Sequence, residues 1–184
     1  MSSRYDIEDA KAVLLIVDIQ DKLAAVVRDA DTVISNALHL IELSRLCDIP
    51  VLVTQQYPEG LGPTVQALKD ALPGAKYVDK TTFNCCRTGA FMKALKAVNR
   101  ETVILCGIET HICVLQTCIE LLQVGYIVHV VKDCAASRSL DNKEAAIEYM
   151  RDAGAVITTT EIVLFQTLKK AGTDNFKIIA KRIK

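Results

Sequence analysis

Short runs of branched apolar residues recur along this chain, separated by longer segments with helical spacing. The runs are at residues 12–17, 51–54, 76–78, 102–105, 127–131 and 155–158. Several of them are almost continuously apolar, which is typical of parallel strands covered by helices on both faces. The pattern therefore predicts an α/β fold built from βα units. With 184 residues and 51% hydrophobic content, the chain is expected to form a single domain, residues 1–184.

Apolar residues at intervals of three and four predict helices over 31–46, 88–98, 112–122, 141–153 and 161–171. Thr110 is the expected N-cap of the third helix, and Asp141 with Glu144 resembles a capping box at the start of the fourth. Beyond Gly172, we expect the short basic tail to be a solvated surface.

Composition limits the classes of function. Twenty-two Lys and Arg balance twenty-two Asp and Glu, so the chain has no net positive field to attract nucleic acid or acidic membrane. Seven cysteines, an odd number scattered through apolar stretches, favour a reducing compartment. The longest apolar run is too short to span a membrane. We expect a cytoplasmic protein that binds neither nucleic acid nor membrane; acidic residues near the N-terminus make a mitochondrial address the less favoured alternative.

Three reactive side chains follow separate strands. Asp18 follows the first apolar run, Lys80 the third, and Cys113 lies soon after the fourth, in the first turn of the next helix. Each also has an ordinary interpretation: Asp18 as a turn residue, Lys80 as a surface lysine and Cys113 as a buried, unreactive thiol. Because parallel strands end at one edge of a sheet, the three are expected to meet there. A helix N-terminus near a lysine would lower the pKa of the Cys113 thiol, so the set predicts a nucleophilic triad without histidine.

At these residues the sequence resembles the isochorismatase-like cysteine hydrolase superfamily, over nearly its whole length. The matching segments, in order, are LLIVDIQDKL, VTQQYPEGLGPTV, DKTTFNCC, CGIETHICVLQT and HVVKDCAASRS. The resemblance implies a three-layer αβα sandwich with a six-stranded parallel sheet in the order 3-2-1-4-5-6. It also implies homo-oligomerisation.

The same resemblance implies catalytic roles for Asp18, Lys80 and Cys113. It further implies a cis peptide between Ile108 and Glu109, which turns the backbone N–H groups of Glu109 and Cys113 toward a reacting oxygen. Amides at a helix N-terminus are well placed for such an oxyanion site. Gly107 would permit the close backbone approach.

Gln20, Phe83 and His111 are the candidates for lining a small-molecule pocket. Gln20 shares the loop of Asp18, Phe83 lies near Lys80, and His111 precedes Cys113 by two residues. Since positions i and i+2 face apart on a helix, His111 is disfavoured as a general base for the thiol.

No metal or other cofactor is expected. The nicotinamidase branch of the superfamily carries an Asp, His, His metal site after its second strand, whereas residues 55–60 here read QQYPEG. His39 and His129 are interpreted as structural, and the cysteine spacing does not match that of zinc sites.

Three hypotheses remain open at this point. The first is a metal-independent hydrolase in which Cys113 attacks a small amide-like substrate and forms a covalent intermediate. The second, from the isochorismatase branch, is protonation of a vinyl ether by Asp18 without a covalent cysteine step. The third is an oligomeric scaffold with a vestigial site. A nuclease is disfavoured because basic stripes and carboxylate clusters are lacking.

Overall fold

The computed structural model describes residues 3–184, and its six strands form one parallel sheet in the order β3-β2-β1-β4-β5-β6. The strands are β1 (Ala12–Val17), β2 (Val51–Gln56), β3 (Tyr77–Lys80), β4 (Thr102–Ile108), β5 (Ile127–Ala136) and β6 (Val156–Thr158). The predicted fold class and strand order are confirmed. The order reverses between β1 and β4, which is where open α/β sheets leave a crevice at their carboxyl edge.

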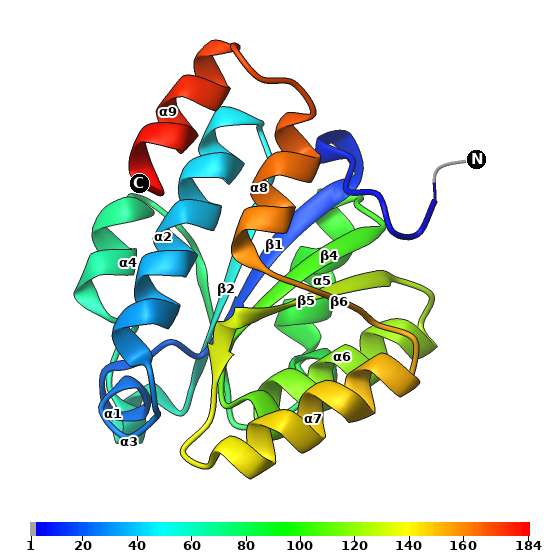
Figure 1. Cartoon of the computed structure of the whole chain (residues 1–184). Helices are drawn as coiled ribbons and strands as arrows, with labels where there is room; N and C mark the ends of the chain where they lie inside the picture. Colours follow the sequence, from blue (N-terminus) through cyan, green and yellow to red (C-terminus); the bar gives the residue numbers. More distant parts are fainter. Residues whose placement is uncertain (1–2) are drawn as a thin grey trace.

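Helices cover both faces of this sheet (Figure 1). One face carries α2 (Ala30–Leu46), α4 (Gln66–Ala71), α8 (Thr160–Leu168) and α9 (Asp174–Arg182), and the other carries α5 (Gly89–Val98), α6 (Leu115–Gln123) and α7 (Leu140–Asp152). Short helices α1 (Asp21–Ala24) and α3 (Pro58–Leu61) lie at the carboxyl edge. The shorter turns are η1 (Asp9–Lys11), η2 (Cys85–Arg87) and η3 (Thr110–Val114).

The alternating residues of β1 explain why both faces need cover. Leu14 and Ile16 belong to the apolar cluster on the side of α2, while Leu15 and Val17 belong to the cluster on the side of α5 and α6. Every residue of β1 is buried, as expected for the central strand of a two-sided sheet.

Three local expectations were wrong. Thr110 is not an N-cap but the first residue of η3, a π-helical turn that precedes α6. The N-cap of α7 is Ser139, whose hydroxyl accepts from the Asn142 N–H, because the helix begins one residue before Asp141. The basic tail is not a loose surface segment: it forms α9, whose Ile179 is fully buried in the same cluster as α2.

Candidate active site

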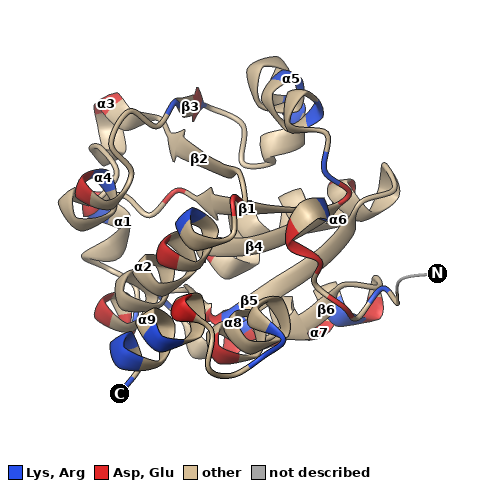
Figure 2. Ribbon diagram, turned by 90° about the horizontal axis from the view of Figure 1, so that it is seen from above, with Lys and Arg blue, Asp and Glu red and all other residues tan. Residues whose placement is uncertain are grey.

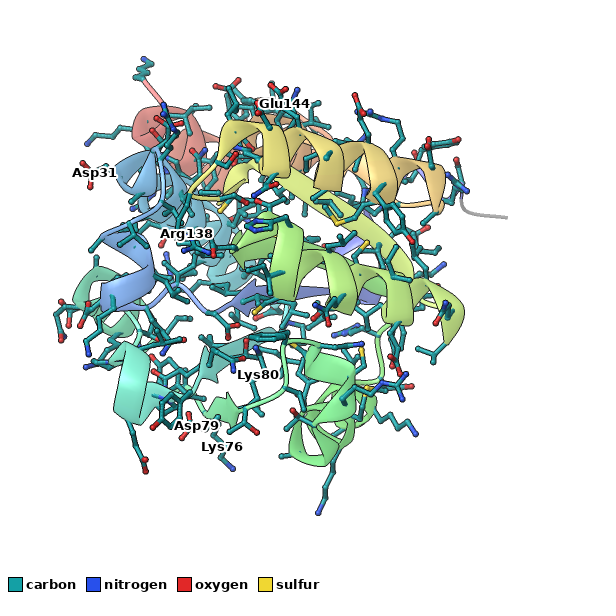
Figure 3. All side chains as sticks on the ribbon, turned by 90° about the horizontal axis from the view of Figure 1, so that it is seen from below. Asp31, Lys76, Asp79, Lys80, Arg138 and Glu144 are labelled. Atoms are coloured by element: carbon teal, nitrogen blue, oxygen red, sulfur yellow. The ribbon has the colours of Figure 1, made fainter. Side chains whose placement is uncertain are left out.

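Asp18 and Lys80 form a buried ion pair at the carboxyl edge of the sheet. The Lys80 Nζ lies 2.6 Å from Asp18 Oδ2, and both side chains are 0% exposed. Asp18 immediately follows β1 with a left-handed φ of 52°, and Lys80 is the last residue of β3. In Figure 3, Lys80 is turned inward, whereas Lys76 and Asp79 lie toward the rim of the molecule.

Strand β2 lies between these two strands and supplies a polar partner for each charge. The Thr54 hydroxyl donates to Asp18 Oδ1 at 2.7 Å, so both carboxylate oxygens have a partner. The Lys80 ammonium donates to Gln56 Oε1 at 2.7 Å and to the carbonyls of Thr82 and Phe83 at 3.2 and 3.3 Å. Burial alone would lower the pKa of Lys80, but the Asp18 carboxylate and the nearby thiols raise it above its usual value.

Cys113 lies in η3, where its thiol interacts with both members of this pair. The residue is 4% exposed, and its thiol lies within electrostatic reach of the Asp18 carboxylate and the Lys80 ammonium. Burial raises the pKa of Cys113 well above its usual value, the Asp18 charge adds to this, and the Lys80 ammonium offsets it only in part.

The expected lowering of the Cys113 pKa is therefore wrong. Asp18 and Lys80 already neutralise each other, so ionising the thiol would leave an uncompensated negative charge in a buried cluster. Burial thus favours the protonated thiol, and Asp18 is the nearby carboxylate that can take its proton.

A second buried thiol, Cys85, belongs to the same cluster. It donates weakly to the Thr54 hydroxyl at 3.8 Å, and its backbone N–H donates to the Thr117 hydroxyl at 3.0 Å. Burial raises the pKa of Cys85 to about 11. Sequence reasoning did not single out Thr54, Gln56 or Cys85. A signal existed for the first two, since both are polar residues at alternate positions continuing an apolar run.

The peptide bond between Ile108 and Glu109 is cis. The Glu109 carboxylate accepts from the backbone N–H of Arg138 at 2.9 Å and from its Nε at 3.1 Å. The loop after β5 thus holds the segment that leads into η3. Gly107 has the expected close approach, because a built Cβ would lie 2.0 Å from the Val17 carbonyl oxygen.

The three pocket candidates differ in their surroundings. Gln20 is fully buried, and its side-chain amide bonds to the backbone of Gln56 and Gly62 instead of facing an open pocket. Phe83 is 53% exposed, and this residue contacts Lys80 through its carbonyl. The His111 Nδ1 lies 2.9 Å from the Ser137 hydroxyl.

A surface pocket of about 500 Å³ opens beside Lys80, lined by residues that include Tyr57, Thr82, Arg87 and Thr88. Asp18 and Cys113 do not line it. In the part of the chain that the structure describes, His, Cys, Asp and Glu side chains form no cluster of three or more suited to a metal ion.

Comparison with known proteins places these features in a family. Residues 12–162 match the family model described as "Isochorismatase domain". Isochorismatase domain-containing protein 2A of Mus musculus is 38% identical over 174 residues, which cover 94% of this chain and 82% of that protein.

Solved structures agree over nearly the full length. The structure described as MAR1 ribonuclease from Caenorhabditis elegans is 37% identical with a TM-score of 0.90, and the match covers 97% of this chain and 92% of the other. YcaC from Pseudomonas aeruginosa, described with hexane-2,5-diol and covalent acrylamide, is 27% identical with a TM-score of 0.92. The match covers 99% of this chain and 93% of that one. YcaC from Escherichia coli, described as an octameric hydrolase of unknown specificity, is 26% identical with a TM-score of 0.92. The match covers 99% of this chain and 92% of that one.

Proposed function

Since the chain belongs to the isochorismatase family, we propose that it is a metal-independent cysteine hydrolase of small amide-like C–N substrates. The observation that carries the proposal is the buried Asp18–Lys80 ion pair, whose two charges both act on the buried Cys113 thiol. In this arrangement a nucleophile, a proton acceptor and a cation lie in one cluster.

The first half of the reaction follows from the protonation states. Asp18 takes the thiol proton as the Cys113 sulfur forms a bond to the substrate carbonyl carbon. Charge then develops on the carbonyl oxygen, which the backbone N–H groups of Glu109 and Cys113 stabilise. Asp18 returns the proton to the leaving nitrogen, the C–N bond breaks, and a thioester remains on the sulfur.

Hydrolysis of the thioester reverses the same proton transfers. Asp18 takes a proton from water, the hydroxide oxygen bonds to the thioester carbon, and the C–S bond breaks. The carboxylic product leaves, and the sulfur regains a proton. Throughout, Lys80 offsets negative charge on either the carboxylate or the sulfur, which is why both must lie near it.

Two features of relatives support a reactive site of this type. One is the covalent acrylamide described for the Pseudomonas aeruginosa protein, since acrylamide is a small neutral electrophile. The other is the word hydrolase for the Escherichia coli protein, whose octameric state also supports the expected homo-oligomer.

A nuclease function has weaker support. One relative is described as a ribonuclease, but acidic and basic residues are interspersed over the helices of this chain (Figure 2), and its formal net charge is zero. Phosphodiester binding usually relies on a concentrated basic surface. RNA therefore belongs in the test as a comparison substrate.

Replacement of Cys113 tests the proposal most directly. We expect Cys113→Ala to abolish hydrolysis of any small amide that the wild type cleaves, because no bond to sulfur can form. Replacing Asp18 or Lys80 would be less informative, since loss of one buried partner costs about 3–5 kcal/mol of stability. The measurement is product release across a panel of amides and carbamoyl compounds, with RNA and a vinyl ether included.

Cys118→Ala is the matched control, since this thiol lies five positions further along and is buried inside α6. It should retain turnover, and acrylamide should add to Cys113 in intact protein. Wild-type turnover by Cys113→Ala would refute covalent catalysis, and cleavage of the vinyl ether alone would support the Asp18 protonation mechanism instead.

A further inference from the structure

Gln56, the last residue of β2, has a side chain that is held at both ends. Its Nε2 donates to the Thr81 carbonyl at 2.8 Å, and its Oε1 accepts from the Lys80 ammonium at 2.7 Å. An amide nitrogen can only donate and an amide oxygen can only accept. The two contacts therefore fix the orientation of the amide, with its negative end toward Lys80.

The backbone of Gln56 is held just as firmly, by the side chain of Gln20. Gln20 Oε1 accepts from the Gln56 N–H at 2.7 Å, and Gln20 Nε2 donates to the Gln56 carbonyl at 3.0 Å. Strand β1 has already ended at Val17, so the Gln20 amide takes the place of the next sheet partner. This accounts for a fully buried glutamine in the loop that carries Asp18.

These contacts define where the Lys80 ammonium lies. An ammonium has three N–H groups. The two short contacts go to Asp18 Oδ2 and Gln56 Oε1, and longer ones go to the carbonyls of Thr82 and Phe83. Asp18 alone would set one direction for the ammonium, and Gln56 supplies the second short contact.

We propose that Gln56 is a positioning residue that holds the Lys80 ammonium against Asp18 and within electrostatic reach of the Cys113 sulfur. It acts through Lys80, without contact with the reacting atoms, and Gln20 keeps it in place. The role rests on the function proposed above, because it matters only when Cys113 must lose a proton.

The expected effect follows from the charges around Lys80. The titratable groups that face it are Asp18 after β1, Cys85 in η2 and Cys113 in η3. When Cys113 passes its proton on, Lys80 is the cation that stabilises the thiolate. If the ammonium loses its second short contact, it no longer stays at this position, and the thiolate becomes harder to form.

Gln56→Met tests this role, with Gln55→Met as its matched control. Neighbouring strand residues point to opposite faces, and the Gln55 side chain bonds to Thr64 and Asp79, away from the Lys80 ammonium. The measurement is the rate of acrylamide addition to Cys113, followed by peptide mass spectrometry between about pH 7 and pH 10. Melting temperatures of all variants are measured in parallel.

We expect Gln56→Met to slow addition to Cys113 by about fivefold or more at each pH measured, because a smaller fraction of the thiol is ionised. Gln55→Met should stay within about twofold of the wild type. If Gln56→Met does not fold, Gln56→Asn replaces it, since the shorter amide cannot span from Lys80 to Thr81. Equal rates of addition in the Gln55 and Gln56 variants would overturn the proposal. So would a slowing of both variants that follows how far each melting temperature falls below that of the wild type.

A double substitution separates action through Lys80 from a direct effect on sulfur. In a Lys80→Met background, Gln56→Met should cause no further slowing, because the group that it positions is gone. Additive slowing would overturn the positioning role.

The assay needs no substrate, so the two proposals can fail separately. If no amide is cleaved but Gln56→Met slows addition, only the hydrolase proposal fails. If Cys113 cleaves amides and Gln56→Met adds acrylamide at the rate of Gln55→Met, only the positioning role fails.

Discussion

Gly107 is a residue for which both conformation and space forbid a side chain. Its φ is +133°, and a built Cβ would lie 2.0 Å from the Val17 carbonyl oxygen and 2.7 Å from its carbon. We expect Gly107→Ala to lower the free energy of unfolding by about 3 kcal/mol or more, since positive-φ strain and a backbone clash combine. Chemical denaturation measures this loss.

Gly125→Ala is the control for positive-φ strain without a clash. Gly125 has φ +94°, and no atom lies within 4 Å of where a Cβ would be. A loss of about 1 kcal/mol is expected there. Equal losses at the two glycines would contradict the importance of the Val17 contact.

At the same scale, the charged pair of the site could be anticipated, whereas its polar partners carry only a weak sequence signal. Asp18 and Lys80 stand out because each breaks an apolar run where a strand ends, and parallel strands end together. Thr54 and Gln56 look like ordinary strand-end residues until the neighbours of β2 are known. The protonated state of Cys113 depends on burial and on the charge of Asp18, which local helix position does not indicate.

Strands and long helices follow from apolar periodicity, and their centres lie where the sequence predicts them. Their ends differ because pairing extends them: β4 and β5 continue together to Ile108 and Ala136 through one irregularity in register. The helix α9 was missed because its short sequence, DNFKIIAKR, holds as many charged residues as apolar ones. Packing against α2 and α8 makes it a stable element.

Paired substitutions in α9 test that packing. Ile179 is 0% exposed and its neighbour Ile178 is 39% exposed. We expect Ile179→Ala to cost about 2–4 kcal/mol of unfolding free energy and Ile178→Ala less than about 1 kcal/mol. Thermal unfolding monitored by circular dichroism would show the difference, and indistinguishable melting temperatures would contradict the packing of α9.

At the scale of the whole molecule, a buried imidazole couples stability to pH. His129 in β5 is 0% exposed, and its Nε2 lies 3.1 Å from the Arg4 carbonyl oxygen. Burial lowers the pKa of His129 below its usual 6.5. As pH falls below that value, the unfolded chain binds a proton that the folded chain does not, so the free energy of unfolding decreases.

We expect His129→Gln to flatten the fall in stability between about pH 7 and pH 5. Urea denaturation at several pH values gives the slope. A slope equal to that of the wild type would show that His129 does not contribute. His39, whose pKa is lowered by burial and by Arg182, should give a change of the same sign when replaced by glutamine.

The position of β1 at the centre of the sheet bears on how the chain is made. β1 is synthesised first, yet its partner β4 comes much later, since Ala12 pairs with Thr102. Ribosomes add about 5–20 residues per second, so this strand waits on the order of ten seconds for that neighbour. During translation, an apolar edge is thus open to other nascent chains. Newly made copies of this protein should depend on chaperones that shield such edges more than refolded ones do.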